Sequence, residues 1–193
     1  MSDKLNPVAE VGATLSRAGG LIESALAEGT YVFECFDAEG NLKWREEVKN
    51  TVMTVGKNLA LDTFLAGSAY TVTGPFMGLI SSTSFSAISA ADTQSSHAGW
   101  LEAGSANAPH YSGTRKTAAW NAASAGSKAL SASLAFSITT SGTIKGAFMT
   151  YGTGAVNTID DTNGTLLSAG LFTGGDRSVV NGDTVNVSYS LAM

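Results

Sequence analysis

The feature that most constrains the fold of this chain is an alternation of apolar and polar residues near its C-terminus. Val185, Val187, Tyr189 and Leu191 are separated from one another by single polar residues. Successive side chains of a β-strand point to opposite faces of a sheet, so this spacing predicts a strand with one buried face. The Asn181-Gly182 pair just before it is typical of a tight turn.

A second alternating pattern lies further toward the middle of the chain. Residues 134–139 alternate apolar with small or polar side chains, and Ile144, Gly146 and Phe148 repeat the spacing after Ser141-Gly142. Two alternating runs around a short Gly-containing turn predict a β-hairpin in which Ile144, Gly146 and Phe148 share one face.

The first β pattern begins at residue 30. Tyr31, Phe33 and Cys35 fall on one face of a strand, and residues 38–41 form a turn before the chain returns toward Lys49. This arrangement predicts another hairpin.

Three further segments carry shorter signals. Residues 76–82 and 165–172 are apolar runs bounded by turn residues and predict buried strands. Residues 56–65 have helical spacing of their apolar positions and predict one short helix, which Gly67 would end.

Together these elements predict a mainly β fold. About eight strands separated by Gly and Asn turns, with one short helix, fit an antiparallel β-sandwich, of which a jelly roll is one version. We divide the chain into an N-terminal arm, residues 1–29, and a β-sandwich domain, residues 30–193. The pattern does not give the order of the strands.

The N-terminal arm differs from the rest of the chain because its apolar residues have a broken helical spacing. They are Val8, Val11, Leu15, Leu21, Ile22 and Leu26, with Gly19-Gly20 between them. A segment with so few apolar residues is poorly ordered by itself. We therefore expect the arm to bind a partner. The candidate partner-contacting residues are Val8, Val11, Leu15 and Ile22. Deletion of residues 1–28 should leave the β body folded and weaken attachment.

Charge and apolar content exclude some functions. Only 14% of residues are charged and the net charge is −5, which disfavours binding to nucleic acid because that binding depends on Lys and Arg. No window reaches the roughly 18 apolar residues of a membrane span, and the N-terminus does not resemble a signal peptide. We therefore expect synthesis in the cytoplasm and no membrane partner. The single cysteine, Cys35, excludes an intrachain disulfide.

The best candidate for catalysis is the segment from Asp92 to His97, in which Ser95 or Ser96 would be the nucleophile. The chain has only two histidines, His97 and His110, and lacks a Gly-x-Ser-x-Gly elbow. Neighbours in sequence seldom form a catalytic triad. We expect instead that Asp92 caps a turn and His97 makes a local hydrogen bond, and that the protein is not an enzyme.

Residues 160–164, Asp-Asp-Thr-Asn-Gly, combine oxygen ligands with a glycine turn, as calcium sites do. They lack the twelve-residue spacing and final glutamate of an EF-hand, so a simple turn is the preferred interpretation. We expect no metal and no cofactor.

Trp44, Trp100 and Trp120 suit either a core or an interface. The core is the preferred interpretation for each. Trp100 follows a loop-like His-Ala-Gly sequence, so of the three it is the best candidate for contact with a neighbouring molecule.

An ordered series of fragments resembles a family of tailed-phage structural proteins. The fragments are Asn50-Thr51-Val52, Val55-Gly56-Lys57-Asn58, Leu65-Ala66-Gly67-Ser68-Ala69-Tyr70, Gly78-Leu79-Ile80-Ser81-Ser82, Ser96-His97-Ala98-Gly99-Trp100, Thr114-Arg115, Gly142-Thr143-Ile144-Lys145-Gly146-Ala147-Phe148, Ser168-Ala169-Gly170-Leu171-Phe172 and Asn181-Gly182-Asp183-Thr184. The resemblance covers roughly residues 30–193 and implies a non-catalytic virion protein, without defined functional residues to transfer.

Within a virion, the preferred interpretation is a capsid decoration, or cement, protein that binds and stabilises the assembled head. Its partner would be the major capsid protein, its location the virion, and a homo-oligomer is expected. The alternative is a tail-fibre or head-fibre subunit that binds a host surface glycan, for which Tyr70, Tyr111 and Tyr151 are candidate stacking residues. An enzyme such as a glycan depolymerase ranks third, because the carboxylates fall mainly in turns.

Overall fold

The computed structural model describes residues 27–65 and 73–192 of the chain. Nearly all of the expected N-terminal arm lies outside the described residues. The same holds for four of the candidate partner-contacting residues: Val8, Val11, Leu15 and Ile22.

The first two strands form the antiparallel hairpin that the sequence predicts. They are β1 (Glu28–Phe36) and β2 (Leu42–Val52). In the turn between them, the Oδ1 atom of Asp37 accepts a hydrogen bond from the Asn41 amide at 2.7 Å. Gly40 has a φ of 86°, a left-handed conformation that glycine adopts without strain. The face of β1 that the alternation predicts is buried: Tyr31, Phe33 and Cys35 are each 0% exposed.

The chain continues with one helix, α1 (Thr54–Leu65), and nine further strands in the described residues. The strands are β3 (Phe76–Ser81), β4 (His110–Tyr111), β5 (Lys116–Thr117), β6 (Ser127–Ala129), β7 (Leu134–Thr140), β8 (Gly142–Tyr151), β9 (Thr165–Leu171), β10 (Arg177–Val179) and β11 (Thr184–Ala192). The predicted strands at 76–82 and 165–172 and the closing strand are confirmed as β3, β9 and β11. The predicted helix is confirmed as α1, which begins at Thr54.

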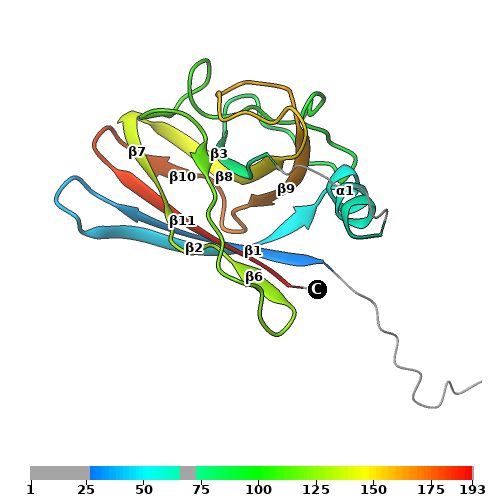
Figure 1. Ribbon diagram of the computed structural model, residues 1–193. Coiled ribbons are helices and arrows are strands. Elements are labelled where there is room, and N and C mark those ends of the chain that lie inside the picture. The colour runs from blue at the N-terminus through cyan, green and yellow to red at the C-terminus, as the bar shows by residue number, and fades with distance from the viewer. Residues whose placement is uncertain (1–26, 66–72, 193) are drawn as a thin grey trace, which may run out of the picture.

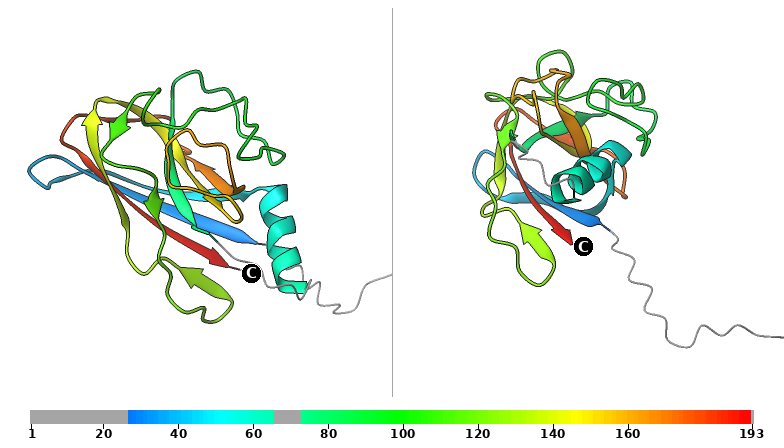
Figure 2. Two further views of the ribbon diagram at one scale, coloured as in Figure 1. Left: turned by 45° about the horizontal axis from the view of Figure 1, so that its top comes forward. Right: turned by 45° about the vertical axis from the view of Figure 1, so that its right-hand side comes forward.

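These strands form one antiparallel sheet that curls into a half-barrel. Its hydrogen-bonded order is β4-β7-β11-β1-β2-β9-β8-β3-β5, with β10 added beside β8 and β6 beside β11. Figures 1 and 2 show β11, β1 and β2 as one wall, and β3, β8 and β9 as the facing wall. The mainly β class with one short helix is therefore confirmed.

The two separate sheets of a sandwich are not confirmed, because β2 belongs to both walls. Most of its length pairs with β1, with Thr30 opposite Lys49, while its last residues turn into the facing wall. There Asn50 pairs with Gly170 and Val52 with Ser168 of β9. One continuous strand thus joins the walls by main-chain hydrogen bonds.

The hairpin predicted across Ser141-Gly142 is wrong. β7 pairs with β11, with Leu134 opposite Val187, whereas β8 pairs with β3 and β9 in the facing wall. A Cβ atom on Gly142 would lie 2.8 Å from the backbone nitrogen of Pro109, so the chain crosses between the walls in a crowded position. Alternation indicates which side chains are buried, but it does not identify the neighbouring strand.

The shared face predicted for Ile144, Gly146 and Phe148 is also wrong. Ile144 belongs to the core between the walls, and Phe148 to a cluster on the outer face of β8. The pairing of β8 with β3 shifts register between Ile80 and Ser81. Such a β-bulge inserts one residue and exchanges the faces that follow it.

The apolar residues form two layers. The larger lies between the walls and includes Tyr31, Phe33, Met77, Phe136, Met149, Val187 and Tyr189. The smaller consists of Met53, Ile80, Trp100, Phe148, Leu166 and Ala169. The Tyr31 hydroxyl joins the two walls through a 2.8 Å hydrogen bond with Ser168.

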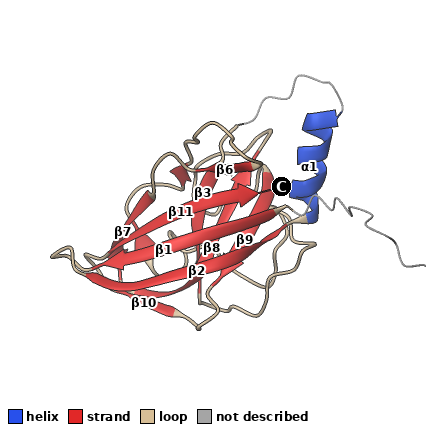
Figure 3. Ribbon diagram, turned by 90° about the horizontal axis from the view of Figure 1, so that it is seen from below, coloured by secondary structure: helices blue, strands red, loops and turns tan. Residues whose placement is uncertain are grey.

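Helix α1 stands at the end of the half-barrel where β1 begins and β11 ends, as Figures 2 and 3 show. The Met53 amide donates a hydrogen bond to the Leu167 carbonyl of β9 at 3.0 Å and so positions the helix start. A Cβ atom on Gly56 would lie 2.7 Å from the same carbonyl oxygen, so only glycine allows this close approach. In the described part of the chain, no helix has the length and apolar character needed to cross a membrane.

A candidate binding groove at one end of the half-barrel

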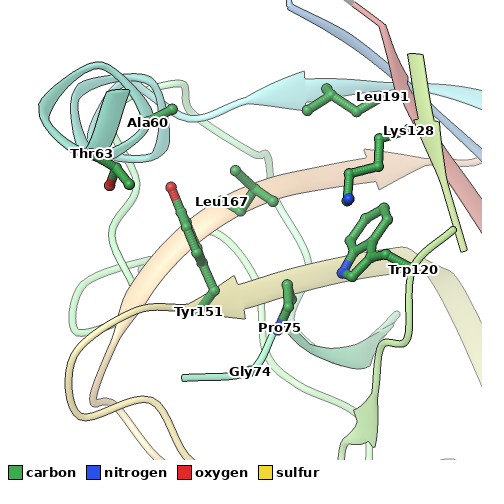
Figure 4. Close-up of a pocket in the computed structure, with 9 residues that line it drawn as sticks. All are labelled: Ala60, Thr63, Gly74, Pro75, Trp120, Lys128, Tyr151, Leu167 and Leu191. Atoms are coloured by element: carbon green, nitrogen blue, oxygen red, sulfur yellow. The ribbon is translucent and has the colours of Figure 1, made fainter. Parts of the chain in front are cut away.

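An open groove of about 560 Å³ lies between α1 and the β6 side of the sheet. Figure 4 shows the side chains that line it. They are Ala60, Thr63, Gly74, Pro75, Trp120, Lys128, Tyr151, Leu167 and Leu191. Residues far apart in the sequence therefore meet here, and the groove exists only in the folded chain.

One wall of the groove comes from α1, which contributes Ala60 and Thr63. The helix is held in place by Tyr151, at the end of β8, whose hydroxyl donates a hydrogen bond to the Gly56 carbonyl at 3.2 Å. The Thr63 hydroxyl donates to the Leu59 carbonyl at 2.7 Å, within the helix itself. This wall is thus fixed to the sheet at the start of the helix.

The opposite wall is formed by Trp120 and by the short strand β6. The half-buried Trp120 ring packs edge-to-face against Tyr189, with ring centroids 6.0 Å apart, and its backbone bridges to Leu130. Such an edge-to-face pair holds the indole in a defined orientation. Lys128 of β6 lies opposite Leu191 of β11.

The strand ladder also places the start of β1 beside the groove. Gly29 pairs with Leu191, which is itself a lining residue, and Glu28 pairs with Ala192. Leu191 therefore lies between β1 on one side and Lys128 of β6 on the other. The chain enters the β body within one strand spacing of the groove, about 5 Å.

The lining of the groove is mostly apolar. Lys128 is the one charged side chain among the lining residues that the structure describes. Most of the other lining residues expose carbon atoms to the groove. Trp120 adds a large apolar surface of the kind found in the centre of interfaces. The groove thus suits an apolar segment that carries a negative charge near one edge.

A second cluster joins loops on the outer side of the sheet through a buried ion pair. Arg115 donates to both carboxylate oxygens of Glu102, at 2.9 and 2.7 Å, and both side chains are almost completely buried. Arg115 also donates to the Asp161 carbonyl at 2.8 Å, and Glu102 accepts the Asp160 amide at 2.8 Å. We call this pair the Arg115–Glu102 clamp, because it ties the loop at 102 to the loop at 160.

Burial governs the electrostatics of this clamp. Desolvation raises the pKa of Glu102 above its ordinary value, while Arg115 and the Asp160 amide counteract the rise. Since both charged groups lack solvent access, the clamp is a structural connection and offers no reactive group to a substrate. The sequence gives only one hint of this clamp, a charged residue between the apolar Leu101 and Ala103.

The expected contact of Trp100 with a neighbouring molecule is wrong for this conformation, because Trp100 is 0% exposed. Its indole nitrogen donates to Asp92 at 3.0 Å, and its ring stacks on His97 with centroids 3.9 Å apart. The loop that carries it crosses the outer face of the sheet, where Phe148 needs an apolar cover. The general preference for a core position is confirmed for this tryptophan.

The segment considered for catalysis makes local contacts. Asp92 accepts the Ser89 amide at 3.0 Å, and His97 Nδ1 lies 3.0 Å from the Trp100 carbonyl oxygen. These are the turn-stabilising and local hydrogen bonds that the sequence predicts.

The segment considered for calcium forms a turn. Asp161 Oδ1 accepts the Asn163 amide at 2.8 Å, and Gly164 has a φ of 92°. Within the described residues, no three His, Cys, Asp or Glu side chains are grouped as metal ligands. The turn interpretation of residues 160–164 is confirmed.

Two of the three tyrosines considered for glycan stacking, Tyr111 and Tyr151, are not surface platforms. Tyr111 is 4% exposed and packs edge-to-face on Phe136. Tyr151 is 9% exposed, and Tyr70 lies outside the described residues. Stacking on a sugar requires an accessible ring face, so Tyr111 and Tyr151 give no support to glycan binding.

Comparison of the chain with protein-family models, curated proteins and solved structures gave no match.

Proposed function

We propose that this protein is a non-catalytic virion component that decorates the assembled head of a tailed phage. Its partner in this proposal is the major capsid protein, and its location is the virion, after synthesis in the host cytoplasm. It acts by binding the assembled lattice and not the free subunits, which stabilises the lattice by mass action. Repeated copies over the shell make a modest contact effective.

The observation that carries the proposal is the position in the fold of the sequence fragments that resemble phage proteins. Residues 78–82, 142–148 and 168–172 form most of β3, β8 and β9, which are neighbours in one wall. Residues 96–100 lie in a loop whose Trp100 packs on the outer face of that wall. A large part of the resemblance therefore concerns the framework of one wall, and we take this as support for a relationship in fold.

The shape of the body supports an attachment role. The β1–β2 turn lies at one end of the half-barrel, and α1 and the start of β1 lie at the other (Figure 2). The groove is at the α1 end, because Ala60 and Thr63 line it. The body is a stiff spacer, because the two walls share the continuous strand β2 and one packed core. Attachment through the groove end would place the hairpin away from the shell.

The proposal also includes the form of the body and its assembly. The body is a jelly-roll-like sandwich in the broad sense that two β walls face one another across a core. The protein acts as a homo-oligomer on the lattice, because capsids present symmetric positions to which several copies bind together.

The experiment is a binding assay on genome-free heads of the virus that encodes this chain. Purified full-length protein is expected to sediment with expanded heads and not with unassembled capsid protein. A variant without residues 1–20 keeps the β body and is expected to bind more weakly. Cryo-electron microscopy of the complex should show density on the shell. Absence of binding to heads, or density only on the tail, would refute the decoration role.

A further inference from the structure

The groove lies directly beside the point where the N-terminal segment joins the body. Gly29 is the strand partner of Leu191, which lines the groove, and the described chain begins at residue 27. Twenty-six residues precede this point. Residues 21–26 span at most about 20 Å when extended, which is enough to reach the groove from residue 27.

The composition of that short segment complements the groove. Residues 21–26, Leu-Ile-Glu-Ser-Ala-Leu, contain three large apolar side chains and one charge, Glu23. The groove is mostly apolar and has one charged lining residue, the exposed Lys128. We propose that residues 21–26 of the same chain occupy this groove, with their apolar side chains inside it and Glu23 beside Lys128.

Tethering favours the same chain over a second copy. A segment linked by only a few residues experiences an effective concentration on the order of millimolar, far above that of a second molecule in dilute solution. The Gly19-Gly20 pair ends the docked segment, since two glycines permit a change of direction. Val8, Val11 and Leu15 then remain beyond the groove for another partner. This inference goes beyond the proposed function and does not depend on it.

The test is chemical cross-linking of the isolated full-length chain with a short bismaleimide. One cysteine is placed in the segment by Ser24→Cys and the other on the groove wall by Thr63→Cys, two small replacements at polar positions. The natural Cys35 stays in place, because it is fully buried and burial raises the pKa of its thiol to about 12. The matched control pairs Ser24→Cys with Val180→Cys, an exposed site in the turn between β10 and β11.

The proposal predicts an intramolecular cross-link between positions 24 and 63, at several times the yield of the 24–180 pair. Ile22→Asp in the 24–63 background should reduce the yield several-fold, whereas Val11→Asp should leave it unchanged. No effect of Ile22→Asp on the 24–63 yield would show that the segment is only tethered near the groove and would overturn the proposal. Equal yields in both pairs would also overturn it, because docking predicts the higher yield at position 63. A covalent dimer as the main product would assign the groove to a second copy and also overturn it.

Discussion

Replacement of Arg115 by methionine is the most informative single change, because it removes one half of the Arg115–Glu102 clamp and retains most of the side-chain volume. The substitution leaves the Glu102 carboxylate buried at 4% exposure with the Asp160 amide as its remaining described donor. It also removes the donor to the Asp161 carbonyl.

The expected loss follows from this geometry. Removal of one partner of a buried ion pair costs about 3–5 kcal/mol, because a charge stays buried without compensation. A domain of this size has a free energy of unfolding of about 5–15 kcal/mol, so the variant should still fold. The double variant Arg115→Met, Glu102→Gln has no unpaired buried charge at this site and keeps an acceptor for the Asp160 amide. It should therefore be more stable than Arg115→Met alone.

The pH dependence has a defined sign. Without Arg115, burial raises the pKa of Glu102 further, because the main opposing charge is gone. A carboxyl group with a raised folded-state pKa contributes stability that is present below its ordinary pKa, about 4.3, and is lost as the pH rises through the folded value. The deficit of Arg115→Met relative to the natural chain should thus be smaller at roughly pH 5 than at roughly pH 8.

Urea denaturation, compared through the midpoint at constant slope, measures these differences. The matched control is Arg45→Met, which breaks an exposed pair with Glu34 whose side chains are 51% and 43% accessible. It should change the free energy of unfolding by less than about 1 kcal/mol. If Arg115→Met behaves like Arg45→Met, or if the double variant is no more stable than Arg115→Met, the argument from buried charge is wrong.

Three further predictions concern other described contacts. Cys35 should resist alkylation in the native protein at neutral pH and react fully in denaturant, because its thiol is buried and burial raises its pKa to about 12. Mass spectrometry measures the labelling, and rapid labelling of the native protein would contradict this prediction. Trp100→Phe should destabilise the fold by about 1–3 kcal/mol in a denaturation experiment, since it leaves the Asp92 carboxylate without its indole donor. Gly56→Ala should move α1 away from Leu167 and lower the melting temperature, because the added Cβ would meet a backbone oxygen.

The parts of the fold that depend on local pattern were predictable from the sequence. The β11 alternation around Val187 and the turn at Gly40 each follow from neighbouring residues, and both are confirmed. Strand partners were not predictable, because alternation is satisfied equally by any neighbour that buries the same face. The bulge that places Ile144 and Phe148 on opposite faces depends on the pairing of β8 with β3, so the residues next to it in the sequence do not predict it.

The candidate site was less predictable than the fold. Trp120 was noted as a possible interface residue, but its position opposite α1 results from the pairing of β6 with β11, which is set far away in the sequence. The clamp could not be predicted from the sequence for the same reason, because Glu102 and Arg115 meet only where two loops converge over the sheet. Trp100 was misplaced because its loop-like sequence suggested exposure, whereas the outer face of β8 supplies an apolar surface that it covers.

The topology explains why one end of this molecule has the features of a binding site. β1 and β11 are antiparallel neighbours, so the strand that opens the β body begins where the closing strand ends, with Gly29 beside Leu191. β6 adds to that same end of β11 and brings Lys128, while Tyr151 and the start of α1 close the other side. At the opposite end, β1 and β2 continue directly into each other through a tight polar turn, which needs no cover. The groove therefore lies at the end of the body where the chain enters β1, which is the physical basis for the proposal that residues 21–26 occupy it.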